Sequence, residues 1–275
     1  MVAGWGKWLA GGLCLAASHT GAAPLLIGAE DDWAPYSVLN RETGQLQGLA
    51  PELVRAVFST EGIEVAFRTL PFARCMHDAK SDQLAGCFDA TITDENRDQY
   101  FWHETPMFSE DLAIFALASE PRRDLDLASL KGKRVGITLG YTYPTNFMAD
   151  PQIARFQAKS DAQILDMLAR GRVDYILMNG MPGYLKIREK ALTGQVVKVG
   201  KLSTDGFWVA FSRQHPLGED MAKRFEKGLQ KIKMNGTYDA LMQGSEHAER
   251  CSSHIPPPFR HQSTQPSHKV ITAVH

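Results

Sequence analysis

Short apolar stretches alternate with amphipathic stretches along most of the chain. Leu49, Leu53, Val54, Val57 and Phe58 recur at helical spacing and predict a helix over residues 49–61. The other predicted helices cover 73–80, a turn or more after Pro144, 161–170, 182–191, 217–234 and a short stretch ending at 242. The predicted strands cover 25–29, 63–69, 86–92, 112–118, 134–139, 173–178, 196–200 and 206–212. This alternation predicts an α/β protein with largely parallel sheets, built as two units of similar plan.

The N-terminal residues have the pattern of a secretory signal peptide. Lys7 is followed by an apolar run over 8–17 and by small residues, so we place cleavage after Ala22. The run is far shorter than the roughly 20 residues that span a bilayer, and no later segment is long and apolar enough. We therefore expect a periplasmic protein with no transmembrane segment in its mature chain. Lipid attachment at Cys14 is the alternative, but Leu13 stands where a small residue is expected.

Residues 245–275 predict a disordered tail, because they are rich in Pro, Ser, Gln and His and show no apolar period. Histidines recur there every seven residues, at His247, His254, His261, His268 and His275. Together with Cys251 they raise the alternative of a metal site. The spacing matches no structural zinc motif, so we predict no bound metal and no cofactor.

Composition and charge exclude several classes of protein. The 275 residues are 44% hydrophobic, which provides a sizeable core for one or two domains. Lys and Arg number 30 against 31 Asp and Glu, so no excess charge favours nucleic acid or an anionic membrane. Four cysteines without a Cys-x-x-Cys pair exclude a disulfide scaffold and a zinc module.

Five short motifs lie in order along the chain and together resemble one known family. They are Gly28-Ala29-Glu30 with Trp33-Ala34-Pro35-Tyr36; Thr91-Ile92-Thr93-Asp94-Glu95-Asn96-Arg97 with Phe101-Trp102 and Pro106; Leu130-Lys131-Gly132-Lys133-Arg134-Val135-Gly136; Gly171-Arg172-Val173-Asp174; and Asn235-Gly236-Thr237-Tyr238-Asp239. From about residue 25 to 242 the chain resembles the family 3 extracellular solute-binding proteins. The resemblance implies the type II periplasmic-binding-protein fold, in which two α/β lobes are joined by a two-stranded hinge. It also implies a monomer that captures a small-molecule ligand and hands it to the membrane permease of an ABC importer.

The resemblance implies where the lobes begin and end. After the signal peptide at 1–22, the first lobe would comprise 23–112 and the returning helices 210–244. The second lobe would comprise 120–203. The hinge would cross at 113–119 and at 204–209, where a few extended residues absorb the change in backbone angles as the lobes close.

The family places an arginine at the position of Arg97, where it binds a ligand carboxylate through two parallel hydrogen bonds. The alternative is a surface arginine in an acidic loop. Thr91 and the backbone of Asp89 match family positions that bond the ligand, although a threonine also suits a strand end. Arg74 is a second candidate cation, or an exposed helix residue.

The family also implies the remaining walls of the cleft. Trp33, Tyr36 and Phe72 would form an apolar wall over the ligand, although aromatic residues also fill cores. Thr142 precedes a predicted helix whose N-terminus would attract an anion, and it would also serve as that helix's cap. From these matches we expect the ligand between the lobes.

One position departs from the family pattern. Asn179 stands where amino-acid binders have an aspartate that takes the ligand's ammonium group. An amide supplies no charge, so a plain α-amino acid is disfavoured unless Glu30, Asp31 or Asp89 holds the amine. The ligand would otherwise be a carboxylate without a free amine, or a modified compound.

Cys75 and Cys87 are the cysteines inside the predicted fold, one on a helix and one on the adjacent strand. In an oxidising compartment they either form a disulfide beneath Phe72 or remain two buried thiols.

Two other functions use the same fold. Periplasmic cyclohexadienyl dehydratases resemble these binders and add a carboxylate general acid in the cleft. Glu30, Asp31, Asp89 and Glu104 are acids near the predicted site, but no paired acid/base spacing stands out, so we predict no catalytic residue and no enzyme. A ligand-sensing module is the third possibility, and it would need a separate signalling partner.

Overall fold

The structure is a computed structural model that describes residues 23–252, with side chains described up to residue 245. The predicted signal peptide at 1–22, with Cys14, lies outside the described residues. So do the predicted tail from 253 onward and the side chains of His247 and Cys251. No described helix is both long and apolar enough to cross a bilayer.

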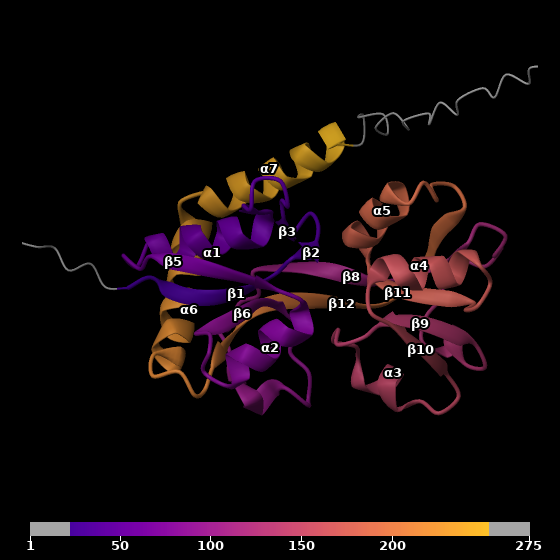
Figure 1. The fold of residues 1–275 in the computed structure, drawn as a ribbon, viewed down its shortest axis with the longest axis horizontal. Coiled ribbons are helices and arrows are strands. Elements are labelled where there is room, and N and C mark those ends of the chain that lie inside the picture. The colour runs from indigo at the N-terminus through magenta and orange to yellow at the C-terminus, as the bar shows by residue number, and fades with distance from the viewer. Residues whose placement is uncertain (1–22, 253–275) are drawn as a thin grey trace, which may run out of the picture.

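Two lobes lie side by side, each a sheet with helices on both faces (Figure 1). In the first lobe, strand β1 (Leu25–Glu30) pairs in parallel with β5 (Val65–Leu70) and β6 (Gly86–Ala90). Helices α1 (Leu49–Ser59), α6 (Gly218–Met234) and α7 (Thr237–Ser252) pack together on one side, and α2 (Phe72–Lys80) lies on the other. The five apolar positions that predicted α1 are all buried, so its amphipathic face forms part of the core as expected.

Smaller elements complete this lobe. A separate sheet contains β2 (Asp32–Trp33), β3 (Ser37–Leu39) and β4 (Leu46–Gln47). A 3₁₀ turn, η1 (Arg97–Gln99), precedes β7 (Tyr100–Phe101), which pairs with β12.

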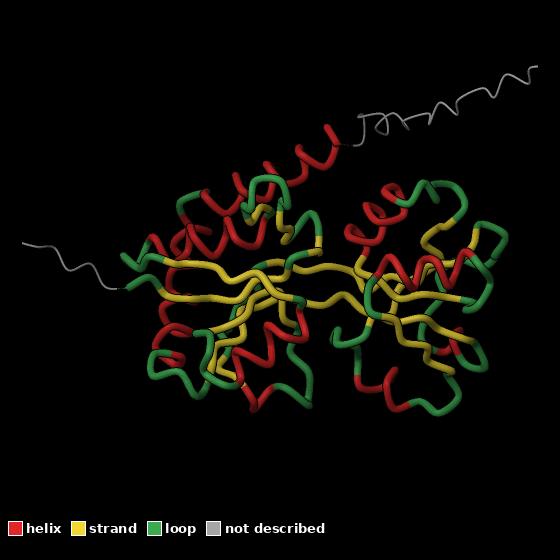
Figure 2. Tube along the Cα trace, viewed as in Figure 1, coloured by secondary structure: helices red, strands yellow, loops and turns green. Residues whose placement is uncertain are grey.

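The second lobe repeats the plan with different strand lengths. Parallel strands β10 (Ala154–Ala158), β9 (Arg134–Thr138) and β11 (Tyr175–Asn179) form its sheet. Helices α4 (Asp161–Ala169) and α5 (Gly180–Glu189) cover one core, and α3 (Thr145–Ala149) and the 3₁₀ turn η2 (Ala128–Leu130) border the other. Each lobe thus has its own apolar core, as the two-lobe fold requires. Figure 2 shows the strands as the layer between the helices in both lobes.

Two long antiparallel strands connect the lobes. Strands β8 (Phe108–Leu117) and β12 (Val196–Ser212) pair from Phe207↔Phe108 to Val196↔Leu117. The chain over 196–212 is therefore one bulged strand rather than the two predicted.

The predicted hinge at 113–119 is placed too late in the chain. Residues 112–115 pair with β11, so they lie inside the second sheet. Residues 208–211 of β12 pair with β6 in the first lobe, whereas 203–207 pair only with β8. An apolar strand pattern cannot show where one sheet ends and the next begins, because the same residues face a core in both.

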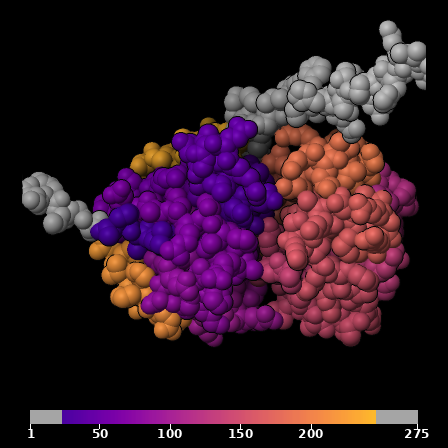
Figure 3. Space-filling view, in the orientation of Figure 1, coloured from indigo at the N-terminus to yellow at the C-terminus, as the bar shows by residue number. Residues whose placement is uncertain are grey.

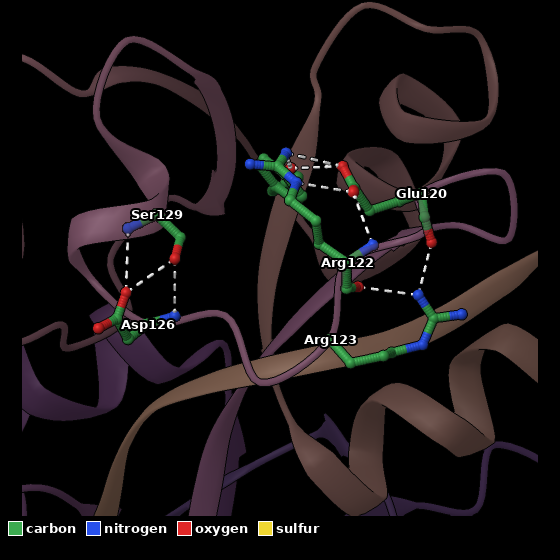
Figure 4. Close-up of polar contacts among 6 residues, drawn as sticks. Glu120, Arg122, Arg123, Asp126 and Ser129 are labelled. Carbon is green, nitrogen blue, oxygen red and sulfur yellow. Dashed lines mark hydrogen bonds and ion pairs between the residues drawn. The ribbon is translucent and has the colours of Figure 1, made fainter.

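Polar contacts fix the chain where it leaves β8 (Figure 4). The Arg122 guanidinium donates to both carboxylate oxygens of Glu120 at 2.9 Å, and Tyr175 Oη donates to Glu120 Oε2 at 2.6 Å. These contacts lower the pKa of Glu120 to about 2. Asp126 then accepts from the backbone and side chain of Ser129 at the start of η2. The cluster anchors this connection at the end of β11 opposite Asn179, away from the lobe boundary.

Helix α7 continues to Ser252, so it includes the first eight residues, 245–252, of the predicted tail. Glu246, Ala248, Glu249 and Arg250 have favourable helix propensities, and no proline occurs between Thr237 and Pro256. The predicted tail began at 245 because the apolar periodicity ends there. Helix propensity alone accounts for the further residues of α7.

Candidate functional site

The polar residues of the site stand at the carboxyl ends of strands that face the lobe boundary. Glu30 ends β1, Asp89 is the penultimate residue of β6, and Asn179 ends β11. In open α/β sheets these strand ends border the crevice in which ligands bind. Figure 3 shows the two lobes meeting along a groove.

Two adjoining pockets open at this boundary. The inner pocket spans about 380 Å³, including space open to solvent, and is lined by Glu30, Trp33, Phe72, Asp89, Thr91, Leu112, Tyr141, Thr142, Asn179, Asp205 and Phe207. The outer pocket spans about 1070 Å³, also including space open to solvent, and is lined by Thr91, Ile92, Thr93, Asp94, Arg97, Thr142, Tyr143, Pro144, Thr145, Asn146, Ala149, Ser203 and Asp205. Thr91, Thr142 and Asp205 belong to both, so a single small molecule could span the two. Both lobes contribute to each pocket.

The lobes touch directly around the inner pocket. Tyr141 Oη, from the second lobe, donates to Glu30 Oε1 at 2.6 Å, and its ring lies edge-on to Phe72 with centroids 6.0 Å apart. At the rim, Lys186 Nζ lies 3.0 Å from Asp32 Oδ1. These contacts hold the described arrangement, in which the lobes are together.

The inner pocket is acidic. Burial is the main cause that raises the pKa of Glu30 to about 8, with Asp161, Asp31 and Asp32 adding repulsion against the hydrogen bond from Tyr141. Burial also raises the pKa of Asp89 well above its usual value, and Glu30 adds to this. Among the described residues that line this pocket there is no Lys, Arg or His. The pocket is thus short of positive charge.

Asp161 stands behind the inner pocket without lining it. Its carboxylate accepts a hydrogen bond from the Thr138 hydroxyl, and burial raises its pKa to about 6.

Arg97 lies in the outer pocket and not beside the aromatic wall. Its loop is shaped by Asn96, which donates to Thr91 O at 2.8 Å and accepts from the Thr93 amide at 2.7 Å. The Arg97 side chain is 60% exposed, and its Nη2 lies 3.8 Å from Asp94. The guanidinium is therefore accessible to a ligand anion in the outer pocket.

Tyr36 and Arg74 do not line either pocket, which corrects two predicted site residues. Tyr36 is buried behind Trp33, where its ring stacks on Phe108 at 4.6 Å and its hydroxyl donates to Glu110. Arg74 points to solvent and pairs with Asp78 at 2.7 Å. A loop pattern predicts an aromatic residue near the cleft, but not whether its ring turns to the cavity or the core.

Thr142 does not cap helix α3, which corrects one of its two predicted roles. Helix α3 begins at Thr145, after Pro144, and no side chain caps it. The helix has about one turn, which leaves little of the dipole that would attract an anion. Thr142 instead lines both pockets.

Cys75 of α2 and Cys87 of β6 form a disulfide, which resolves the alternative that the sequence left open. The bond lies within the apolar cluster that contains Phe72, so it ties the wall of the inner pocket to the first sheet.

Four residues that line the inner pocket were missed by sequence reasoning: Leu112, Tyr141, Asp205 and Phe207. Tyr141 belongs to the Gly140-Tyr141-Thr142 segment, so its place beside Thr142 was the available signal. The other three lie on β8 and β12. They were not considered as site residues because these segments were predicted to form the hinge or its border. No group of three or more described His, Cys, Asp or Glu residues is arranged to hold a metal ion.

Residues 25–244 match the family of bacterial extracellular solute-binding proteins, family 3. A probable histidine-binding protein of Campylobacter jejuni is 23% identical over 228 residues, covering 81% of this chain and 84% of that protein. The histidine-binding periplasmic protein of Salmonella typhimurium is 23% identical over 224 residues, covering 78% and 84%.

Solved structures share the fold. An ancestral arginine-binding protein bound to arginine has a TM-score of 0.69 at 22% identity and covers 80% of this chain and 97% of its own. A histidine kinase sensor domain with similarity to periplasmic binding proteins has a TM-score of 0.72 at 23% identity and covers 80% and 95%.

Proposed function

The chain belongs to family 3 of the bacterial extracellular solute-binding proteins, and from this premise we propose that it captures a small polar solute between its lobes in the periplasm. The solute is of amino-acid type and carries a carboxylate. The observation that carries the proposal is the inner pocket, because residues of both lobes line it at the carboxyl ends of strands that face the lobe boundary. The relatives' names, histidine- and arginine-binding proteins, support the amino-acid class.

In this proposal both lobes supply residues that contact the solute. Arg97 binds the carboxylate in the outer pocket through charge-assisted hydrogen bonds. Trp33 and Phe72 cover the body of the solute, and Thr142 and Asn179 contact it from the second lobe. A ligand that contacts both lobes stabilises their closed arrangement by its higher affinity for that state.

We place the hinge at residues 108–111 of β8 and 203–207 of β12. These stretches pair only with each other and lie between the two sheets. Lobe closure would therefore change the backbone angles of these few residues and leave both sheets intact. The partner would be the permease of an ABC importer, which accepts the closed protein. Sensing for a separate signalling partner is the second candidate, and the similarity to a kinase sensor domain favours it.

The proposal is tested by thermal unfolding of the purified protein with amino acids, organic acids, small peptides and prephenate-like compounds. A ligand at 100 times its Kd adds about 2.7 kcal/mol to stability. Arg97→Ala should abolish the shift, whereas Arg74→Ala, an exposed arginine outside both pockets, should keep it. If no compound shifts the midpoint, solute capture is wrong. If the compound is consumed, a dehydratase-like enzyme replaces the binder.

A further inference from the structure

Asp89 is a buried acidic residue that no described side chain or backbone group compensates. Its side chain lines the inner pocket, the residue is 4% exposed, and neither carboxylate oxygen has a hydrogen-bond partner among the described residues. Its backbone φ is 63°, in the left-handed region that few non-glycine residues adopt. A buried polar group without a partner is costly, and native structures keep one where it has a use.

The surroundings of Asp89 are acidic. Glu30 and Asp205 line the same pocket, whereas Arg97 lines only the outer pocket. Lys186 on α5 lines neither pocket and pairs with Asp32 and Glu189. A ligand that brings positive charge would therefore favour ionisation of these acids, which burial and their proximity to one another otherwise oppose.

The rest of the lining fits an organic cation. Trp33, Phe72, Tyr141 and Phe207 supply aromatic rings, and the faces of such rings attract ammonium and guanidinium groups. The described carboxylates are not grouped to coordinate a metal ion.

We propose that the inner pocket binds a protonated amine or guanidinium group with Asp89 as its principal counter-ion and Glu30 as the second. This inference rests on the proposed function and deepens it, because it names the charge of the solute. Asn179 supplies no charge from the second lobe, so the cation is held by the first lobe. The carboxylate of the same solute would then reach Arg97 through the polar residues that both pockets share.

Binding should release protons. Burial keeps the Asp89 and Glu30 carboxyls protonated to higher pH than usual, and Tyr141, Asp161 and Asp205 are the other titratable groups around them. A bound cation favours the carboxylate form, so each acid that ionises gives its proton to the buffer while the ligand keeps its own. Affinity for a cation should consequently rise with pH from 6 to 8.

The test is calorimetric titration with three probes: L-arginine, agmatine, which lacks the carboxylate, and succinate, which lacks the cation. L-arginine and agmatine should bind, and each should bind at least tenfold more weakly to Asp89→Asn. Asp82→Asn is the matched control, because Asp82 is exposed and has a similar φ of 65°. Heats in Tris and in phosphate at pH 7 should differ for the wild type through proton release, and differ less for Asp89→Asn.

Three results would contradict the proposal. Succinate binding with no binding of the two cations would overturn the inference while the proposed function stands. Cation binding that is unchanged in Asp89→Asn would also overturn it. If the wider screen described above finds no ligand at all, the proposed function fails and the inference fails with it.

Thermal unfolding of Asp89→Asn without ligand is a second test. Asp89→Asn should raise the thermal midpoint at pH 8, because it removes an unpaired buried carboxylate. A lower midpoint would show that Asp89 serves the fold, and would contradict its role as a ligand counter-ion.

Discussion

Tyr141 and Glu30 bond to each other across the lobe boundary, with Tyr141 Oη donating to Glu30 Oε1 at 2.6 Å. Tyr141 follows strand β9 of the second lobe, and Glu30 is the last residue of β1 in the first lobe. Both line the inner pocket. A single hydrogen bond thus links the closing of the lobes to the protonation state of the pocket.

Tyr141→Phe should weaken the closed arrangement. The ring remains as part of the wall, but Glu30 loses its donor, at a cost of about 1 kcal/mol. We expect affinity for the ligand to fall about fivefold. Tyr184→Phe is the control, because Tyr184 is an exposed tyrosine of the same lobe. Equal affinities for the two variants would show that the cross-lobe bond does not contribute.

Gly140→Ala should interfere with closure. Gly140 has φ 83°, and a Cβ there would lie 2.6 Å from the Ala73 Cβ of the first lobe. Gly132→Ala shares the positive φ, 71°, but meets nothing within 4 Å. Both variants should lose about 1 kcal/mol of stability through backbone strain. Only Gly140→Ala should also lose ligand affinity, by tenfold or more; equal affinity in both would mean that the lobes bind without this contact.

Stability should depend on pH through Glu30. Its pKa rises from 4.5 when unfolded to about 8 when folded, so the folded state binds its proton more tightly. Its contribution is therefore fully present below about pH 4.5 and is lost as the pH rises through 8. The free energy of unfolding, measured in urea from pH 6.5 to 8.5, should fall for the wild type and fall less steeply for Glu30→Gln. Identical slopes would contradict the raised pKa.

His103 sets the lower limit of that pH range. Burial lowers the pKa of His103 to about 4, so its contribution is lost as the pH falls from 6.5 through 4. Measurements above pH 6.5 therefore isolate the carboxyl groups from this opposite trend.

Removing the disulfide should destabilise the first lobe. Cys75 and Cys87 are separated by 12 residues, and closing a loop of that length in the unfolded chain is worth about 3 kcal/mol. Replacing both cysteines with alanine should lower the guanidinium chloride concentration at the midpoint of unfolding. Added reductant should lower this midpoint for the wild type and leave that of the double variant unchanged. If the double variant matches the wild type, the bridge is not formed in the protein.

Much of the architecture could be predicted from sequence, because periodicity reports burial. The five apolar positions of α1 and the strand-helix alternation gave the α/β class, and the motifs pointed to Trp33, Phe72, Asp89, Thr91 and Thr142 at the pockets. Strand β10 was missed because most of its residues are exposed or half-buried, which leaves no apolar alternation to read. The roles of Tyr36 and Arg74 depended on rotamers and neighbours far along the chain, which a local pattern does not contain.

The acidity of the inner pocket illustrates the same limit. Glu30, Asp89 and Asp205 are far apart in sequence, and they converge because β6 pairs with β1 on one side and, beyond Asp205, with β12 on the other. Their individual positions were visible, but the missing partner of Asp89 was not.

Whether one solute is held by both lobes is decided by its Kd in Thr142→Val compared with the wild type. The compound used is the one that gives the largest thermal shift. Thr142 belongs to the second lobe and lines both pockets, whereas Arg97 belongs to the first. We predict that Thr142→Val weakens binding about fivefold or more, as the loss of one hydrogen bond implies, and that Arg97→Ala weakens binding of the same compound. An unchanged Kd in Thr142→Val, with binding lost only in Arg97→Ala, would place the solute on the first lobe alone and contradict capture between the lobes.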